Sequence, residues 1–209
     1  MVQMNENIKK ACELTCERMK ACIERFETFK TEKEVKEFLE RGFELAFTTV
    51  VASGKNAANP HYFENGPLEK GFCVIDFGIK HDGICSDVTR TVYIGTPSQE
   101  EKDLYAYLLR EHYKMLRQVK INAKPRYIER AFRKRLGNKN KLFIHLLGHG
   151  LSDVVHAKMN THLKKGEVIT IEPGLYKKGK WGIRIEDDVV VGEGVVTNLS
   201  RELKIIPKS

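Results

Sequence analysis

The sequence predicts an α+β fold built from two similar halves, each with two helices followed by strands. Two observations predict this fold. Helical periodicity and strand-like runs occur twice in the same order along the 209 residues. Each half also ends in a predicted β-hairpin that carries a pair of acidic residues within apolar sequence. No linker or low-complexity segment divides the sequence, so we expect one domain over residues 1–209.

The first half begins with two predicted helices. Apolar residues recur at helical spacing over residues 5–25, and a second helix is predicted over residues 33–42. Thr31 and Glu34 form a capping-box pattern at the start of the second helix. A β-strand is predicted next, over residues 43–52, and the first acidic hairpin follows it.

The second half repeats this order. Ser98 is an N-cap residue ahead of a long helix predicted over residues 99–119, and Pro125 opens another helix over residues 125–136. A strand is predicted over residues 143–149. The second acidic hairpin completes the order.

Each acidic hairpin is predicted from two strand-like runs on either side of a turn. In the first hairpin the strands are predicted over residues 72–78 and 86–93. In the second they are predicted over residues 167–176 and 182–191, joined by a turn at residues 178–180. Because side chains alternate between the two faces of a strand, counting along the hairpins locates the acidic residues.

The first hairpin has two candidate registers. A loop at residues 81–82 would place Asp76 directly opposite Asp87. A loop at residues 82–83 would place Asp76 opposite Thr89, with Asp87 as the diagonal neighbour on the same face. In either register the two carboxylates lie on one face, within roughly 5 to 8 Å of each other.

In the second hairpin the turn places Glu172 opposite Glu186. A single acidic residue on a strand usually faces solvent or protects a sheet edge. These four acids lie among apolar neighbours, which indicates burial, and buried carboxylates that face each other need a cation. With His149 between the pairs, the donors form a hard set that suits Mn²⁺, Fe²⁺, Co²⁺ or Zn²⁺. The sequence therefore predicts a dinuclear metal site.

The motifs around these residues also match a known family. They are Asp76 and residues 86–91, 148–151, 171–176 and 184–188. In these motifs the chain resembles the pita-bread metallopeptidases (family M24), especially their Xaa-Pro dipeptidase (prolidase) and aminopeptidase P branch. The resemblance covers nearly the whole chain. It implies the pita-bread (creatinase/aminopeptidase-like) fold, in which two pseudo-symmetric halves surround a dinuclear metal site.

The resemblance implies a role for each predicted metal ligand. Asp76 would bind one ion, and His149 and Glu172 the other, while Asp87 and Glu186 would bridge both ions. A hydroxide bridging the two ions would be the nucleophile, because each metal lowers the pKa of bound water.

Further roles follow from the same resemblance. Glu172 would carry the proton from the attacking water to the leaving prolyl nitrogen. His61 and His156 match histidines that bind the substrate and assist catalysis. His145 matches a histidine near the proline-binding pocket. Arg184 is assigned to the substrate site and shares a predicted strand face with one bridging carboxylate, which it would orient.

The implied activity is hydrolysis of the Xaa-Pro bond in dipeptides or at peptide N-termini. The expected partner is a peptide with proline at its second position. Two alternatives stay open, a methionine aminopeptidase-like activity and a non-catalytic peptide-binding module with the same fold. Prolidases and aminopeptidases P also carry an N-terminal domain, and we expect this chain to contain the catalytic domain only.

The charge distribution narrows the expected partners. The formal net charge is +8, and the cations are densest over residues 114–141, where Glu129 is the only acid. Because no nucleic-acid motif accompanies them, we interpret this segment as a solvated helix face and not as a nucleic-acid site. A contact with a second copy of the chain, as in a homodimer, stays open.

His112 is expected on the surface of the helix predicted over residues 99–119.

Other features of the sequence indicate the cellular compartment in which we expect the protein. The sequence has no apolar run long enough to span a membrane. Its polar start carries no secretory signal, which predicts a cytoplasmic protein. The five cysteines are expected to be reduced thiols.

Overall fold

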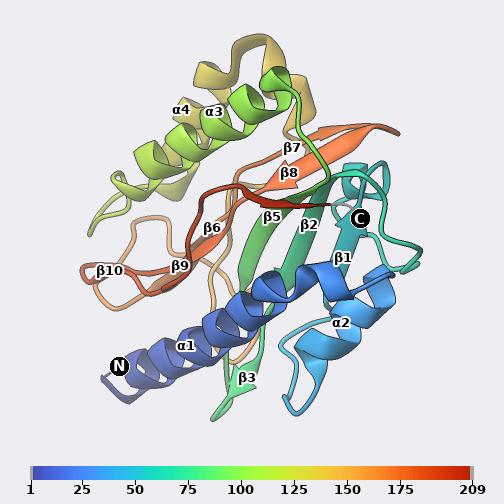
Figure 1. Ribbon diagram of the computed structural model, residues 1–209. Coiled ribbons are helices and arrows are strands. Elements are labelled where there is room, and N and C mark those ends of the chain that lie inside the picture. The colour runs from blue at the N-terminus through green and yellow to red at the C-terminus, as the bar shows by residue number, and fades with distance from the viewer. Residues whose placement is uncertain (1, 208–209) are drawn as a thin grey trace.

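The computed structural model describes residues 2–207, and its helices lie on both sides of a central set of strands (Figure 1). Helices α1 (Val2–Glu24) and α2 (Glu32–Glu40) cover one side, and α3 (Gln99–Leu116) and α4 (Pro125–Leu136) cover the other. Three short 3-10 helices connect these elements: Phe26–Thr28, Asn56–Ala58 and Gly137–Leu142. The predicted order of two helices followed by strands is present in both halves.

Strands of the first half form a four-stranded sheet with one strand from the end of the chain. Its order is β1 (Val50–Ser53), β2 (Gly71–Phe77), β5 (Val88–Ile94) and β11 (Lys204–Ile206). The first three strands pair antiparallel, whereas β11 runs parallel to β5. The last strand of the chain therefore packs back onto the first half.

The second half contributes an antiparallel three-stranded sheet and a separate two-stranded ribbon. The sheet contains β10 (Gly194–Val195), β9 (Asp187–Val190) and β6 (Val168–Ile171), and the ribbon contains β7 (Gly174–Lys177) and β8 (Trp181–Arg184). A small ribbon of β3 (Lys80–His81) and β4 (Ile84–Cys85) extends the first hairpin.

Each helix pair packs on strands of its own half, and α1 also reaches the second half, where Ile8 lies in one apolar cluster with Val168 and Val190. Leu39 of α2 lies in a buried apolar cluster with Ile75 of β2. Phe132 of α4 lies in a second cluster with Ile169 of β6. Removing such apolar surface from water stabilises the fold by about 25 cal/mol per Å². The strands that carry the acidic residues are therefore fixed from both sides of the molecule.

The ends of the predicted helices are close to those observed. Thr31 Oγ1 accepts the Glu34 amide at 3.1 Å and the Glu34 side chain accepts the Thr31 amide, which confirms the capping box. Helix α2 ends two residues earlier than predicted, before Gly42, which has φ +85°. Ser98 and Glu101 form a second capping box at the start of α3.

The predicted strand over residues 43–52 is wrong for most of its length, because only Val50–Ser53 forms a strand. The preceding residues pair instead with the segment after β2. The Ala46 amide donates to the Gly78 carbonyl at 3.1 Å, and the Lys80 amide donates to the Glu44 carbonyl at 2.8 Å. These bonds satisfy the backbone without a continuous ladder.

The predicted strand over residues 143–149 is also absent from the assigned strands. The segment lies beside β6, where the Thr170 amide donates to the His149 carbonyl at 2.9 Å, and side chains of α4 bind other backbone groups. Arg133 donates to the His145 carbonyl at 2.8 Å, and the Glu129 carboxylate accepts the Leu147 amide at 3.2 Å. Backbone groups of this segment are thus satisfied partly by β6 and partly by side chains of α4.

The first hairpin adopts the second of its two candidate registers. Asp76 pairs with Thr89, so Asp87 is its diagonal neighbour on the same face. The loop is formed by Asp82 and Gly83, whose φ angles are +46° and +77°. Two consecutive positive φ angles are typical of the hairpin turn that matches the twist of paired strands.

The second hairpin has the predicted register but not the predicted continuous strands. Gly174 pairs with Arg184, and Ile171 pairs with Asp187, which sets Glu172 and Glu186 at opposing positions. Both strands are interrupted at these acids. The Glu172 amide donates to Leu147 and the Glu186 amide donates to Thr89, so each acid is held by a different segment.

Buried charges join the two halves. Arg90 of β5 is 2% exposed and donates to the Asp187 carboxylate of β9 at 2.7 Å and to the Glu186 carbonyl at 2.6 Å. Burial raises the pKa of Asp187, but Arg90, His112 and Arg201 outweigh burial and hold it below its usual value. The expectation of a surface His112 is wrong. Its ring is fully buried 3.5 Å from Asp187, because α3 packs over the second sheet.

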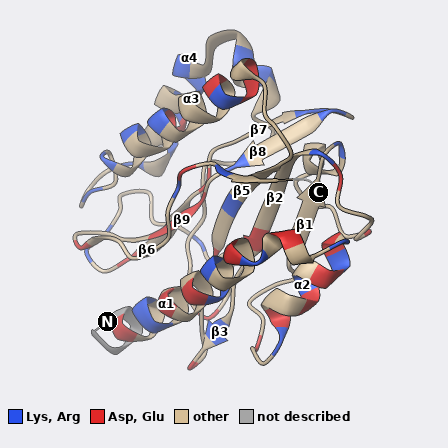
Figure 2. Ribbon diagram, viewed as in Figure 1, with Lys and Arg blue, Asp and Glu red and all other residues tan. Residues whose placement is uncertain are grey.

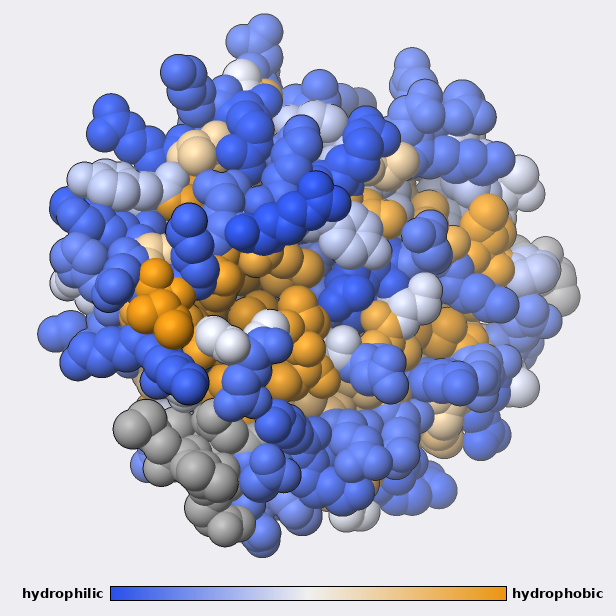
Figure 3. Space-filling view, turned by 90° about the vertical axis from the view of Figure 1, so that its left-hand side faces the viewer, coloured by the Kyte–Doolittle hydropathy of each residue, from blue (hydrophilic) through white to orange (hydrophobic). Residues whose placement is uncertain are grey.

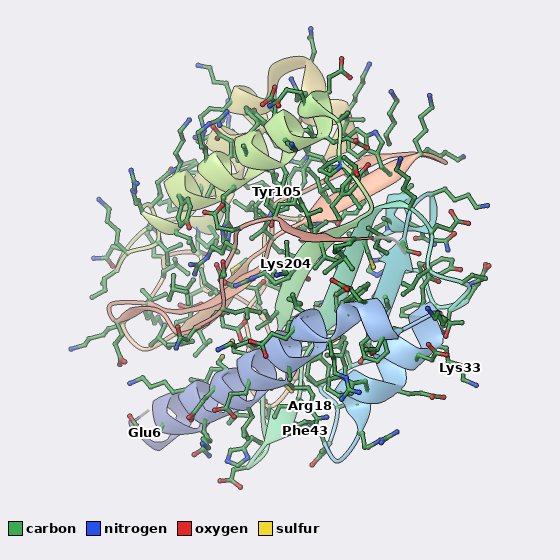
Figure 4. All side chains as sticks on the ribbon, viewed as in Figure 1. Glu6, Arg18, Lys33, Phe43, Tyr105 and Lys204 are labelled. Carbon is green, nitrogen blue, oxygen red and sulfur yellow. The ribbon has the colours of Figure 1, made fainter. Side chains whose placement is uncertain are left out.

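Arg18 links α1 to the end of α2. Its guanidinium donates to the carbonyls of Phe38 and Arg41, each at 3.1 Å, and lies 4.8 Å from the centre of the Phe43 ring. Arg18 and Phe43 lie together below α1 in Figure 4. The first helix pair is therefore tied together on the side away from the second half.

Part of the predicted basic face serves the fold. Lysine and arginine residues cluster on α3 and α4 (Figure 2). Arg133 pairs with Glu129 at 2.8 Å and Arg135 pairs with Glu111 at 2.5 Å, so two of these cations have acidic partners.

Among the described residues, none of the helices has the length and hydropathy needed to cross a bilayer. All five cysteines are free and buried, which agrees with the expected thiols.

We expect Arg90→Met to lower the free energy of unfolding by about 3 kcal/mol, because it leaves a buried carboxylate without its main partner. Urea unfolding followed by circular dichroism measures this change. As a control, Lys10→Met removes an exposed ion pair with Glu13 and should leave the unfolding midpoint near that of the wild type. Equal effects of the two substitutions would contradict the structural role of Arg90.

Candidate metal centre

A cavity of about 430 Å³ lies where the two acidic hairpins face each other. The two hairpins are joined by a hydrogen bond from the Glu186 amide to the Thr89 carbonyl at 3.1 Å. The cavity lining includes Asp76, Glu172 and Arg184 from the hairpins, His145, His149 and His156 from the segment before β6, and Pro60, His61 and Phe63 from the loop after β1.

Apolar surface adjoins the polar floor of this cavity. Phe63 and Leu146 line it and are 48% and 65% exposed. A second cavity of about 380 Å³ lies between α4 and β6, on apolar side chains such as Ile128 and Ile169. On the face shown in Figure 3, hydrophobic residues also gather in a hollow between hydrophilic ones. The floor of the first cavity is charged, whereas its rim can contact apolar side chains.

Three potential metal ligands lie close together at the floor of the site. Ligand atoms of Asp87, His149 and Glu186 all lie within 4.8 Å of one another. His149 Nε2 lies 3.5 Å from Asp87 Oδ2 and 3.7 Å from Glu172 Oε1. The two hairpins and the segment before β6 thus contribute donors to one place, as the sequence predicts.

The His149 ring is oriented by the backbone. Its Nδ1 lies 3.0 Å from the Gly150 carbonyl, which fixes this nitrogen as the donor and leaves Nε2 facing the carboxylates. Burial lowers the pKa of His149, which favours the neutral imidazole that metal ions bind. Gly148 lets the segment approach β6, because a Cβ there would lie 2.0 Å from the Thr170 carbonyl oxygen.

Two carboxylate oxygens in the site are buried without a hydrogen-bond partner, Asp76 Oδ1 and Asp87 Oδ1. A buried carboxylate oxygen that lacks a partner is unfavourable. The other Asp76 oxygen accepts from Arg184 at 2.6 Å. Free, buried anionic oxygens beside a neutral imidazole are suitable ligands for hard divalent cations, so the residues present fit a metal site.

The pKa shifts of the acidic residues also indicate that this site favours a cation. Burial, with the charges of Glu186 and Asp76, raises the pKa of Asp87 well above its usual value. Burial, with Glu172 and Asp76, does the same for Glu186. Burial also raises the pKa of Glu172 to about 8, although Arg184 opposes it. Without a cation the cluster holds protons, and cation binding would release them.

The structure connects Arg184 to Glu186 through one hydroxyl group. We expected Arg184 to orient the carboxylate of Glu186, and its guanidinium donates to Asp76, to Thr89 Oγ1 at 3.0 Å and to Tyr176. Thr89 Oγ1 in turn donates to Glu186 Oε2 at 2.7 Å. Arg184 is thus linked to Glu186 by hydrogen bonds through Thr89, and its charge also opposes the rise that burial causes in the pKa of Glu186, so its orienting role stays a prediction.

Tyr176 was not assigned a role from the sequence. Its hydroxyl accepts from Arg184 Nη1 at 3.0 Å and lies 3.1 Å from His145 Nε2. Burial lowers the pKa of His145 to about 4, with Arg184 adding to the effect, so the ring is neutral. The sequence could have predicted that Tyr176 lies at the site, because it follows Glu172 by four residues and alternation along a strand places both side chains on one face.

The remaining predicted histidines line the cavity from its rim. The His156 ring centre lies 4.5 Å from that of His149, and its side chain is exposed. His61 is also exposed and belongs to the loop after β1. All nine site residues predicted from the sequence therefore lie at or beside one cavity: Asp76, Asp87, His149, Glu172, Glu186, His61, His145, His156 and Arg184. Their individual roles stay predictions.

We expect removal of divalent metal ions to lower the melting temperature, and the loss to grow from about pH 5 to pH 8. The pKa of Glu172 is raised to about 8 in the fold, against about 4.3 in an unfolded chain. In the metal-free fold the stabilising protonated form of Glu172 is therefore lost as the pH rises through its folded-state pKa. Bound cations replace these protons and offset the loss.

Thermal scans with chelator and with Mn²⁺ across this pH range measure the difference. The Asp87→Asn variant should show a smaller difference at every pH. A metal effect that is constant with pH, or that shrinks as the pH rises, would contradict protonation of the acidic cluster.

The sequence matches a family model and the sequences of individual relatives. Residues 6–193 match the model of metallopeptidase family M24. The chain is 32% identical, over 94% of its length, to the Xaa-Pro dipeptidase of Pyrococcus furiosus, and it covers 61% of that protein. It is 33% identical, over 90% of its length, to an uncharacterized peptidase of Staphylococcus saprophyticus, of which it covers 58%. The chain thus spans about three fifths of these relatives.

Solved structures give the same result. An X-Pro aminopeptidase from Thermotoga maritima superimposes with a TM-score of 0.92 and 33% identity, covering 99% of this chain and 63% of that one. A prolidase from Thermococcus sibiricus superimposes with a TM-score of 0.91 and 34% identity, covering 99% of this chain and 62% of that one. These likenesses confirm the predicted pita-bread fold. The chain belongs to metallopeptidase family M24.

Proposed function

We propose that this chain hydrolyses the Xaa-Pro bond of dipeptides or of peptide N-termini. The observation that carries the proposal is the convergence of acidic residues and a neutral imidazole on the floor of one cavity. The names of the relatives support the substrate class, since one is an Xaa-Pro dipeptidase and another an X-Pro aminopeptidase. The substrate is then a peptide with proline at its second position.

The proposed cofactors are two divalent ions, from among Mn²⁺, Co²⁺, Zn²⁺ and Fe²⁺. Asp76 would hold one ion and His149 and Glu172 the other, with Asp87 and Glu186 as the ligands that the two ions would share. When bound, such ions lower the pKa of water and withdraw electron density from the carbonyl under attack. The unpartnered oxygens of Asp76 and Asp87 support this assignment.

Glu172 is the proposed proton carrier. Its carboxyl lies in the cavity lining, and its pKa of about 8 in the metal-free fold indicates a site where a proton is readily held. A carboxylate here can accept a proton from the attacking water and deliver it to the prolyl nitrogen as the peptide bond breaks. The water is thereby split between the new carboxyl group and the new amine.

Other cavity residues bind the substrate in this proposal. His61 and His156 contact the peptide from the rim, and His156 steadies the tetrahedral intermediate. His145, neutral and bonded to Tyr176, offers an uncharged ring edge beside the proline. Arg184 holds Asp76 and Tyr176 in place from beneath. A neutral wall of this kind suits an apolar proline ring better than a charged one.

The basic segment over residues 114–141 has no part in this chemistry. Some of its cations are used within the fold, and we do not assign it a nucleic-acid partner. A homodimer that uses this face is compatible with the proposal, and sedimentation velocity of the purified chain tests it.

We expect Asp87→Ala to reduce metal-dependent hydrolysis by at least about a thousandfold, because the variant removes a ligand shared by both ions. Its far-ultraviolet circular dichroism should match that of the wild type. Asp103→Ala, on the exposed face of α3, is the matched control and should keep full activity. Hydrolysis by the Asp87 variant at the control rate would exclude the bridging role.

The substrate class is tested with three peptides: an Xaa-Pro dipeptide, a longer peptide with proline second, and a Met-Ala peptide. Each is assayed with Mn²⁺, Co²⁺ or Zn²⁺ added to metal-free protein. We expect the proline peptides to be cleaved with a higher kcat/KM than Met-Ala. Faster cleavage of Met-Ala would favour a methionine aminopeptidase-like activity instead, and binding without cleavage would favour a peptide-binding module.

A further inference from the structure

A buried carboxylate lies outside the acidic cluster and has no place in the proposed chemistry. Glu32, the first residue of α2, is 0% exposed. The ion pairs found on α2, Lys33 with Glu37 and Lys36 with Glu40, leave it out. A buried carboxylate without a cation is strongly unfavourable unless hydrogen bonds satisfy its oxygens. The bonds that Glu32 makes therefore indicate why the fold contains it.

The hydrogen bonds of Glu32 reach both ends of one loop. Oε1 accepts the Ser53 amide at 2.7 Å, the Ser53 hydroxyl at 2.8 Å and the Asn56 side-chain amide at 3.1 Å. Oε2 accepts the Gly66 amide at 2.7 Å. The Glu32 amide donates to the Gly66 carbonyl at 2.8 Å. One side chain thus closes the loop that runs from residue 54 to residue 66.

The middle of this loop packs on neighbouring strands, since a Cβ at Gly182 of β8 would lie 1.8 Å from the Ala57 carbonyl oxygen, whereas Glu32 binds both of its ends. Its only assigned element is the short 3-10 helix Asn56–Ala58. Tyr62 and Ala57 pack in a small apolar cluster with residues of β1 and β2. His61 is exposed, and its amide donates to the neighbouring Asn59 side chain at 3.1 Å. The position of His61 over the cavity therefore depends on how the ends of the loop are fixed.

We propose that Glu32 is a positioning residue that sets the place of His61 at the catalytic cavity. This inference rests on the proposed function in giving His61 a substrate role. The ionised carboxylate matters because both of its oxygens act as acceptors: Oε1 accepts three hydrogen bonds and Oε2 accepts a fourth. A glutamine in the same place would turn an NH2 group toward at least one of these donors, which leaves a buried donor unsatisfied.

A double-mutant cycle tests this coupling. Glu32→Gln alone should lower kcat/KM for an Xaa-Pro peptide roughly tenfold or more. In the His61→Ala background the same change should have almost no further effect, since Glu32 acts through His61. Affinity for Mn²⁺ should stay near that of the wild type in all variants. Equal losses in both backgrounds, or weaker Mn²⁺ binding with Glu32→Gln, would overturn the proposal and leave a general structural role.

Two further measurements complete the design. Glu37→Gln removes a carboxylate from the exposed side of the same helix and is the matched control, with wild-type kcat/KM expected. Asn56→Ala removes a single hydrogen bond to Glu32 and replaces Glu32→Gln if that variant does not fold. It should give a smaller loss of kcat/KM that again disappears in the His61→Ala background.

Amide hydrogen exchange separates this inference from the proposed function. Glu32→Gln, or Asn56→Ala in its place, should speed exchange over residues 54–66 and leave β2 and β5 protected. Unchanged exchange in the loop would overturn the positioning role even if the enzyme is active. If the wild type cleaves no peptide, the proposed function fails, and loop exchange alone then decides whether Glu32 positions this segment.

Discussion

Repulsion between buried carboxylates constrains the rest of this structure. Two pairs of acids face one cavity from two hairpins, and burial raises the pKa of at least three of them. Arg184 gives Asp76 a strong ion pair, but unpartnered oxygens remain on Asp76 and Asp87. The fold must hold these oxygens together against their charge, and only cations or protons can neutralise what remains.

Besides the Arg184–Asp76 ion pair, the fold holds them through a neutral donor and a second ion pair farther from the cavity. Thr89 lies opposite Asp76 in the first hairpin and donates to Glu186 of the second, so one hydroxyl connects both acid pairs. Arg90, next along the strand, points to the other side and binds Asp187. Alternation along β5 and β9 thus sends one set of side chains to the cavity and the other to a buried ion pair. The site forms only when the two halves are packed together.

The sequence predicts the parts of the site that follow from local periodicity. Counting residues placed the acid pairs correctly, because a hairpin register depends only on the turn and on alternation. Counting alone left two candidate loops, and the observed one is formed by Asp82 and Gly83, which both have positive φ angles. Alternation did not predict that the segment before His149 would lack an assigned strand, since it pairs with β6 along part of its backbone while side chains of Arg133 and Glu129 on α4 bind other backbone groups.

The site also divides into two kinds of support. The acids lie on or beside paired strands, whereas the histidines at the cavity lie on irregular segments that helix side chains help to hold. Glu32 closes the loop that carries His61, and Arg133 binds the carbonyl of His145. Strand pairing resists local change, because shifting one residue moves its whole face. A loop tied by one carboxylate or one guanidinium can move without disturbing the strands. Substitutions on α2 and α4 can therefore alter how a peptide is held while the charged floor of the cavity stays in place.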